Sequence, residues 1–431
     1  MIRRRRKSPV MNLLEEARSV LSEGTICDGC LGRRFAELSH GLTSRERGKA
    51  LHVAVAMEDD EPYEDVFPED CWVCDGAFSD FDDWAERAAS ALEGYEFETF
   101  LVGTRVPPLV EENEKLLDEI HGDEYTASFS SEFNREVGKR FGEKTDSTVE
   151  FELPDVTVTL DLQRDAVEVE VRSVYFYGRY RKLERGIAQT EWGCYDCEGT
   201  GTRGGEECET CGGTGYIVDE SVEELLRPAF IEVTEGETAT LHGAGREDVD
   251  ALMLGDGRPF VMEVESPRVR DLDTDALQRD ANERADGKVE LNELRRVEGS
   301  VVERVKSLDA SKRYRARVSF SDDITQNGLE DALDALVGTV EQRTPSRVDR
   351  RRADKVRERE VYEATGKVSD DTESGREATV ELHTEGGLYV KELVSGDEGR
   401  TAKSLASLLE VEATVEELDV LAVEAEEKFV E

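Results

Sequence analysis

The most informative stretch of the chain is Gly245-Arg246-Glu247-Asp248-Val249-Asp250, followed closely by a turn and the Pro259-Phe260 step. It places a glycine, an arginine and three carboxylates in one short segment. Such a segment can hold an acidic side chain at the rim of a cleft with a cation beside it. In a chain this acidic, the segment is also consistent with an acidic surface loop. The surrounding sequence has to decide between a functional site and such a loop.

The length and composition are those of a globular protein with two or three domains. The chain has 431 residues, and a domain usually has about 100–200. Hydrophobic residues make up 38%, which is enough for packed cores. No apolar run approaches the ~18 residues of a membrane span, and charged residues interrupt the segment after Lys7 that a secretory signal would need. We therefore expect a cytoplasmic protein with no membrane partner.

The formal net charge of −45 would ordinarily repel nucleic acid. The acidic residues are spread over the whole chain, however, which indicates adaptation to high salt. At molar salt the Debye length is about 3 Å, so only charges at contact range matter. Local basic clusters then become candidates for RNA contact, although each is also consistent with a solvated charged face. These clusters are Arg3 to Lys7, Arg179-Tyr-Arg-Lys182 with Arg185, and Arg347 to Arg359.

All eight cysteines occur in C-x-x-C pairs, a spacing that presents two sulfurs to one metal ion. Two pairs complete an all-cysteine zinc site, and disulfides are disfavoured in the cytoplasm. A thioredoxin-like redox pair is the alternative, but it does not explain four pairs. With every ligand position taken by cysteine, both zinc ions would be structural. The pairs are Cys27/Cys30, Cys71/Cys74, Cys194/Cys197 and Cys208/Cys211.

The second set of cysteines is the clearer one. Each of its pairs is followed by a glycine-rich segment, ending at Gly201 and Gly215. These glycines permit the tight turns in which backbone amides point at the sulfurs. The pairing of the first set is a weaker inference, because a long segment separates its two halves.

Hydrophobic periodicity predicts an α+β organisation. Residues 1–75 form a zinc-binding, helical segment, 76–185 a mixed α/β segment, 186–220 a zinc knuckle and 221–431 one larger α/β domain. Helices are expected at Leu13–Leu21, Phe81–Ala88, Leu329–Val340 and Leu405–Leu409. Strands are expected at Val156–Leu160, Val167–Val171, Arg315–Phe320, Ala378–His383 and Gly387–Lys391.

Several blocks in these segments resemble the archaeal tRNA pseudouridine synthases that modify positions 54 and 55 of the TΨC arm. The resemblance covers nearly the whole chain, including the cysteine pairs, and is most specific in the C-terminal half. It implies a zinc-bearing accessory domain with a THUMP-like RNA-binding fold over residues 76–185, and a pseudouridine-synthase catalytic domain with a mixed sheet. The blocks are Gly178–Thr190, Ala244–Asp250, Leu254–Phe260, Lys312–Tyr314 and Leu388–Val394, with Gly396-Asp397 and Gly399–Thr401.

The resemblance also implies roles for individual residues. Asp248 stands at the position of the catalytic aspartate. Tyr314 matches the tyrosine that packs against the target uracil, and Lys391 the basic residue that pairs with the aspartate. The substrate-binding positions implied in this way are Arg246, Tyr314, Tyr389, Lys391 and Leu393.

Two positions depart from the family pattern. Lys391 stands where many other synthase families carry arginine, so a point charge replaces a bidentate contact with the aspartate. Lys403 stands where a proline is expected. Taken alone, Tyr314 is consistent with a core strand residue and Lys391 with a solvent-facing lysine, while Asp250 competes with Asp248 for the catalytic role.

The residue chemistry is consistent with the resemblance. Pseudouridine formation detaches uracil from ribose, rotates it and rejoins it through carbon. The reaction needs an ionised carboxylate at the sugar, a cation that keeps this carboxylate ionised, and a flat side chain for the ring. We expect tRNA as the partner, no cofactor in the chemistry and no obligate protein partner.

Two other functions are consistent with parts of the sequence. A non-catalytic, zinc-containing tRNA-binding protein would have lost the aspartate or the aromatic pocket, and both are present. The C-x-x-C-x-G-x-G pattern also occurs in chaperone cofactors of the DnaJ family, but this chain has two such repeats rather than four and no His-Pro-Asp motif. The sequence leaves open which of positions 54 and 55 is modified, and whether Asp248 acts as nucleophile or base.

Overall fold

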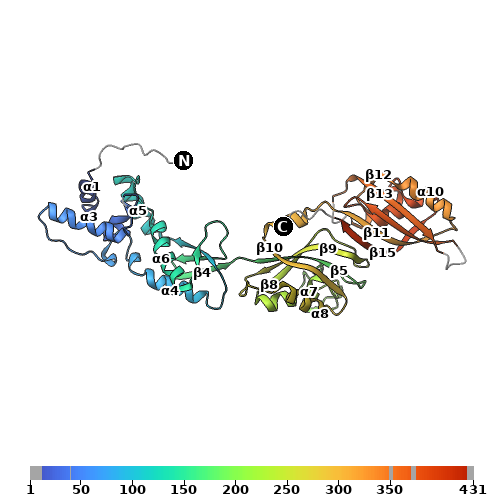
Figure 1. Cartoon of the computed structure of the whole chain (residues 1–431), viewed down its shortest axis with the longest axis horizontal. Helices are drawn as coiled ribbons and strands as arrows, with labels where there is room; N and C mark the ends of the chain where they lie inside the picture. The colour runs from blue at the N-terminus through green and yellow to red at the C-terminus, as the bar shows by residue number, and fades with distance from the viewer. Residues whose placement is uncertain (1–11, 39, 349–352, 370–374, 425–431) are drawn as a thin grey trace. The chain divides into compact units, whose positions relative to one another are not determined.

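The computed structural model describes residues 12–38, 40–348, 353–369 and 375–424 (Figure 1). The chain divides into two compact units, Met1–Arg172 and Ser173–Glu431. This boundary differs from the one expected between residues 185 and 186. The reason is that β5 (Val174–Lys182) pairs with β9 (Leu252–Glu265) and β10 (Val289–Val297) of the second unit. The basic cluster from Arg3 to Lys7 and residues 349–352 of the third cluster lie outside the described residues.

The first unit begins with a helical segment that carries the first cysteine set. α1 (Leu13–Leu21) lies where it is expected. α2 (Asp28–Arg33) and α3 (Ser44–Glu58) pack at very close range. A Cβ atom on Gly32 would lie 1.6 Å from a backbone oxygen of α3, and one on Gly48 would lie 1.8 Å from a backbone oxygen of α2. Glycine at both positions is therefore needed for α2, which carries a cysteine of the first set, to lie so close to α3.

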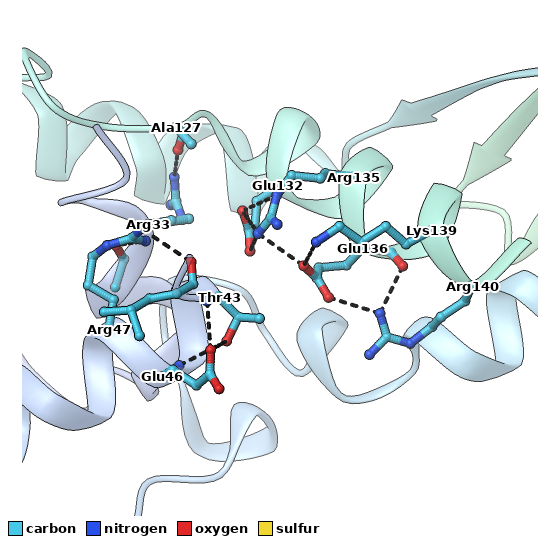
Figure 2. Close-up of polar contacts among 12 residues, drawn as sticks. Arg33, Thr43, Glu46, Arg47, Ala127, Glu132, Arg135, Glu136, Lys139 and Arg140 are labelled. Atoms are coloured by element: carbon cyan, nitrogen blue, oxygen red, sulfur yellow. Dashed lines mark hydrogen bonds and ion pairs between the residues drawn. The ribbon is translucent and has the colours of Figure 1, made fainter. Parts of the chain in front are cut away.

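Polar contacts fix this segment at its edges (Figure 2). The Thr43 hydroxyl accepts a hydrogen bond from the Glu46 amide at 3.1 Å, and the Glu46 carboxylate accepts one from the Thr43 amide at 2.8 Å, which caps α3. The buried Arg33 donates to the Ala127 carbonyl oxygen at 3.1 Å and pairs with Glu114. α2 is thereby joined to the chain segment that precedes α6 (Phe129–Thr145).

A four-stranded sheet with the order β2-β1-β3-β4 forms the rest of the first unit. β1 is parallel to β2 and β3, and β3 is antiparallel to β4. The expected strands and the expected helix of this region are confirmed as β3, β4 and α4. The buried rings of Phe129, Phe133 and Phe141 on α6 lie in the core. The elements are η1 (Pro68–Asp70), η2 (Ala77–Ser79), α4 (Phe81–Ala91), β1 (Thr99–Arg105), α5 (Pro108–His121), α6 (Phe129–Thr145), β2 (Thr148–Val149), β3 (Val156–Asp161) and β4 (Ala166–Val171).

In the second unit the described residues form a nine-stranded mixed sheet (Figure 1). The strand order is β10-β5-β9-β15-β11-β14-β13-β12, with β8 paired to β9. β15 is parallel to β9 and antiparallel to β11, so it joins the two halves of the sheet. The further strands are β8 (Thr238–Gly243), β11 (Ser311–Phe320), β12 (Gly338–Arg343), β13 (Val356–Val368), β14 (Glu377–Thr384) and β15 (Ala413–Glu424).

Helices pack on this sheet on both faces. α7 and α8 lie together against the half with β8 and β10, and α10 and α12 lie against the half with β13. α9 packs on the opposite face, where Val301 and Val305 contact Tyr177 and Val261. None of the described helices is long and apolar enough to cross a membrane. The helices are α7 (Val222–Thr234), α8 (Thr274–Arg284), α9 (Ser300–Lys306), α10 (Gln326–Leu336), η3 (Ser346–Val348), α11 (Val390–Ser395), η4 (Asp397–Gly399) and α12 (Leu405–Leu409).

Three expected elements of this unit are confirmed and two differ. The strands at 315–320 and 378–383 and the helix at 405–409 are β11, β14 and α12. The helix expected up to Val340 ends at Leu336, since Gly338 has a φ of +102° and starts β12. The strand expected at Gly387–Lys391 is wrong: Gly387 turns the chain with a φ of +82°, and α11 begins at Val390, which puts Lys391 on a helix.

Candidate active site and zinc sites

The acidic segment Gly245–Asp250 forms the loop between β8 and β9. Gly245 has a φ of +73°, a conformation that favours glycine. A Cβ atom at this position would lie 3.4 Å from the Nζ of Lys312 and 3.4 Å from the Nη1 of Arg258. The loop therefore passes directly beside two cationic side chains.

Glu247 anchors the loop from inside the protein. Its buried carboxylate accepts a hydrogen bond from Arg258 Nε at 2.7 Å, and both of its oxygens lie 3.0 Å from the Tyr180 hydroxyl. Gln189 donates to that hydroxyl and to the Gly245 carbonyl oxygen, both at 2.9 Å. Burial raises the pKa of Tyr180, so its hydroxyl stays protonated and donates to the carboxylate. Glu247 is thus buried, whereas the side chain that follows it, Asp248, is partly exposed.

A second anchor comes from β5. Lys182 is fully buried, and its Nζ donates to the carbonyl oxygens of Ile187 at 2.7 Å, Asp248 at 3.1 Å and Val249 at 3.1 Å. These contacts use all three protons of the ammonium group. Burial lowers the pKa of Lys182. Lys182 therefore holds the backbone of the loop rather than the Asp248 carboxylate.

The Asp248 carboxylate lies at the surface of the loop between two cations. Its side chain is 35% exposed, and its two oxygens lie 3.2 Å from Lys391 Nζ and 3.4 Å from Arg347 Nη1. Lys391 also pairs with Asp250 at 2.9 Å. Burial acts to lower the pKa of Lys391, but the two carboxylates raise it overall, so the lysine stays charged. The structure thus brings together the aspartate and the lysine that the sequence pointed to.

Arg347 belongs to this centre, although the sequence indicated only a basic cluster there. It lies in η3, and its Nε donates to Glu392 of α11 at 2.6 Å. The contact with Glu392 holds the guanidinium beside Asp248. Arg347 and Asp248 are 99 positions apart, so no local pattern links them.

Tyr314 lies in β11 with its side chain buried. Burial raises its pKa to about 12, while Arg258 acts to lower it and the Asp248 carboxylate acts to raise it. The phenol is therefore within electrostatic range of the aspartate, and it remains protonated at neutral pH.

The other three expected substrate-binding residues have different environments. Leu393 is fully buried on α11. Tyr389 precedes α11, and its backbone amide and carbonyl are both held by the Gln342 side chain, at 2.9 and 3.0 Å. Arg246 is exposed, and its guanidinium lies 4.5 Å from the centre of the Trp192 ring, at the start of the zinc knuckle.

The cysteines form two buried clusters, one in each unit. The sulfurs of each set of four lie within 4.8 Å of one another. A tetrahedral zinc ion with Zn–S bonds of about 2.3 Å holds its ligands about 3.8 Å apart. Both sets fit this geometry, which supports the expected pairing. Sulfur–sulfur distances are 3.9 Å for Cys27 and Cys74, 3.8 Å for Cys194 and Cys208, and 3.7 Å for Cys197 and Cys211.

The second cluster is made of two matching turns linked by the hairpin of β6 (Thr202–Arg203) and β7 (Glu206–Glu207). The Gly201 amide donates to Cys197 Sγ and the Gly215 amide to Cys211 Sγ, both at 3.2 Å. A Cβ atom on either glycine would come within 2.4 Å of a carbonyl oxygen in the other turn. Both glycines are therefore required for the two turns to close around a metal ion.

Comparisons with known proteins match this architecture. A family model described as "Pus10, C-terminal" matches residues 175–424, and one described as "Pus10 THUMP domain, archaeal" matches residues 84–161. The chain belongs to the Pus10 family. A tRNA pseudouridine synthase Pus10 of the halophile Halorubrum lacusprofundi is 56% identical over 97% of this chain and 98% of its own length. One from Methanothrix thermoacetophila is 44% identical over 96% of this chain and 94% of its own length.

Membership in the Pus10 family makes the chain an enzyme of the pseudouridine synthase class with an α+β fold and a THUMP domain. The C-terminal Pus10 model begins within β5, close to the boundary between the two units. A solved Cbf5-Nop10-Gar1 complex aligns with 45% of this chain and 43% of that chain, at 18% identity and a TM-score of 0.29.

Proposed function

We propose that this Pus10 chain isomerises uridine to pseudouridine in tRNA at positions 54 and 55 of the TΨC arm. In this proposal Asp248 is the catalytic carboxylate. The observation that carries the proposal is the position of that carboxylate, partly exposed and within 3.4 Å of both Lys391 and Arg347. The names of the relatives, which specify tRNA pseudouridine synthesis, support the substrate class.

The proposed reaction assigns a role to each group around Asp248. The carboxylate acts at the ribose, as nucleophile at C1′ or as base for a ribose proton, while the C1′–N1 bond breaks. Lys391 and Arg347 place two positive charges within 3.4 Å of it. Tyr314 and Tyr389 hold the detached ring by stacking, and Leu393 supports the pocket wall. The uracil then rotates and C5 bonds to C1′, which frees the carboxylate. C5 loses its proton and N1 gains one, so substrate and product are isomers and no cofactor is consumed.

Zinc has a structural role in this proposal. The two cysteine clusters each offer four sulfurs and leave no position for a reacting group. The first would brace the helical segment of the first unit, and the second the knuckle beside Arg246. The target uridine has to be flipped out of the folded tRNA, at a cost of a few kcal/mol, and the THUMP domain supplies RNA contacts that offset this cost.

The test is to map pseudouridine in an unmodified tRNA transcript after incubation with the purified chain in molar KCl. We expect pseudouridine at positions 54 and 55, with no other protein added. Modification at only one position would correct the specificity, and no modification of any tRNA would refute the proposed function. The proposal also places the enzyme in the cytoplasm, with its substrate.

A further inference from the structure

The cationic side chains on the two faces of β11 differ in whether they have ion-pair partners. On the exposed face, Arg313, Arg315 and Arg317 all pair with glutamates of adjacent strands. The shortest distances are 2.7 Å from Arg313 to Glu363 and to Glu424, 2.9 Å from Arg315 to Glu381 and 2.8 Å from Arg317 to Glu417. Each of these arginines is therefore neutralised at contact range.

Lys312 lies on the other face of the same strand, as Tyr314 does, because side chains two positions apart in a strand share a face. Over the residues that the structure describes, no carboxylate lies within ion-pair distance of its ammonium group, and no hydrogen bond engages it. Lys312 is thus an unpaired cation on the face of β11 that carries the tyrosine of the candidate active site.

The surroundings of Lys312 explain why it stays unpaired. Its Nζ lies beside Gly245, three positions before Asp248, 3.4 Å from the place where any other residue would put a Cβ atom. The neighbouring Arg258 is already engaged, by Glu247 at 2.7 Å and by the Ala244 carbonyl oxygen at 2.7 Å. Of the two cations beside Gly245, Arg258 is therefore paired within the protein and Lys312 is not.

An unpaired, partly buried ammonium is costly for a protein to keep unless a ligand supplies the missing anion. Burial and the nearby Arg258 lower the pKa of Lys312 to about 8, although Glu247 and Asp309 act to raise it. The lysine is thus charged at neutral pH and close to losing its proton.

We propose that Lys312 binds an anionic oxygen of the reacting nucleotide. This inference rests on the proposed function. When the C1′–N1 bond breaks, its electron pair stays on the uracil ring and is shared with the two carbonyl oxygens, which a fixed cation stabilises. The phosphate of the flipped nucleotide offers the same chemistry, and the two sources are separable by experiment.

The variant Lys312→Met tests the contact, and Arg313→Met is its matched control, with the same loss of charge on the opposite face of the same strand. The single-turnover rate at saturating enzyme and the affinity for tRNA are measured in molar KCl. If the ring oxygen is the ligand, Lys312→Met loses about 10²–10³-fold in rate with unchanged affinity. If the phosphate is the ligand, affinity falls and the salt slope of binding decreases by about one.

Rate and affinity of Lys312→Met that equal those of Arg313→Met would overturn the inference. Should wild-type enzyme form no pseudouridine, the proposed function itself fails. Should wild type be active, Asp248→Asn inactive and Lys312→Met normal, only the role of Lys312 fails.

The pH dependence gives a second readout that does not require the methionine variant to fold. The groups facing Lys312 are Arg258 of β9, Glu247 of the loop and Asp309 before β11. Wild-type activity should fall as the pH rises through about 8, because Lys312 then loses its proton. Lys312→Arg stays charged, so its alkaline fall should move to higher pH. An alkaline limb identical in wild type and Lys312→Arg would contradict the proposal.

Discussion

The Nζ of Lys182 lies 3.1 Å from the backbone carbonyl oxygen of Asp248, so the loop that carries the candidate catalytic carboxylate is held by a buried cation of β5. Lys182→Met should leave the Ile187 carbonyl oxygen without this donor, at about 1–3 kcal/mol for a buried group left unsatisfied, whereas the Asp248 and Val249 carbonyl oxygens still accept from the Ala251 and Gly186 amides. We expect a lower melting temperature and a larger loss of activity than of tRNA affinity. Thermal melts, single-turnover assays and filter binding measure these three quantities. A variant with a wild-type melting curve would show that the loop does not depend on this anchor.

Asp248→Asn keeps the shape of the side chain and removes its charge. It should abolish pseudouridine formation and leave tRNA affinity within a few-fold, since the carboxylate acts during the reaction rather than in docking. Asp250→Asn should lose less, because Asp250 contacts Lys391 and has a more exposed side chain, at 63% against 35%. Tritium release from labelled uracil, beside filter binding, separates the two. If Asp250→Asn is the inactive variant, the assignment of the catalytic aspartate is wrong.

Tyr314 separates stacking from hydroxyl chemistry. Tyr314→Ala should lower the rate strongly, because it removes the ring that would hold the detached uracil. Tyr314→Phe should retain much of the rate if stacking is the main role. The raised pKa of about 12 means that the hydroxyl of the free enzyme is protonated throughout the usual assay range. A phenylalanine variant as slow as the alanine variant would instead assign a chemical role to the hydroxyl.

The site illustrates what local sequence can and cannot predict. Asp248 and Lys391 were both identifiable, and the structure places them 3.2 Å apart, although Lys391 lies on a helix rather than on a strand. The five residues from Gly387 to Lys391 do not by themselves reveal that a turn with positive φ precedes the helix. Arg347 was hidden because its contact with Asp248 spans 99 positions.

The supporting residues were missed for a related reason. Glu247 reads as one more acid in an acidic loop, and its burial depends on Arg258 and Tyr180, which come from two other strands. By contrast, period-two alternation placed β3, β4 and β14 within one residue at each end, and β11 at its C-terminal end, because each strand has one buried and one less buried face. Local periodicity was therefore enough to predict these strands, whereas the residues that hold the Gly245–Asp250 loop depend on contacts far apart in the sequence.

Metal content follows from the two cysteine clusters. We expect two zinc ions per chain by elemental analysis. Cys194→Ser should destabilise the knuckle and weaken tRNA binding without selectively abolishing chemistry, because the site is structural. Cys27→Ser is the corresponding variant in the first unit and should lower the melting temperature of that unit. Protein that carries less than about half an equivalent of zinc would refute both sites.

Salt dependence follows from the net charge of −45. Repulsion among the acidic residues should unfold the chain in dilute buffer, and molar KCl should restore a cooperative melt. The arginine–glutamate pairs on β11, at 2.7 to 2.9 Å, lie within the Debye length of about 3 Å at such salt and remain effective. Equal melting temperatures in low and molar KCl would contradict halophilic adaptation.

The central place of β15 in the second sheet has a consequence for the order in which the protein is built. Domains generally fold during synthesis as their residues emerge, and the first unit is continuous in sequence. The second sheet cannot close in this way, because β15 is synthesised after all the strands that it joins. The loop with Asp248 adjoins β9, whereas Lys312 and Tyr314 lie on β11, so they belong to different halves. The nascent chain therefore has its THUMP domain before it has the candidate active site, and insertion of β15 is the step that brings the two halves of that site together.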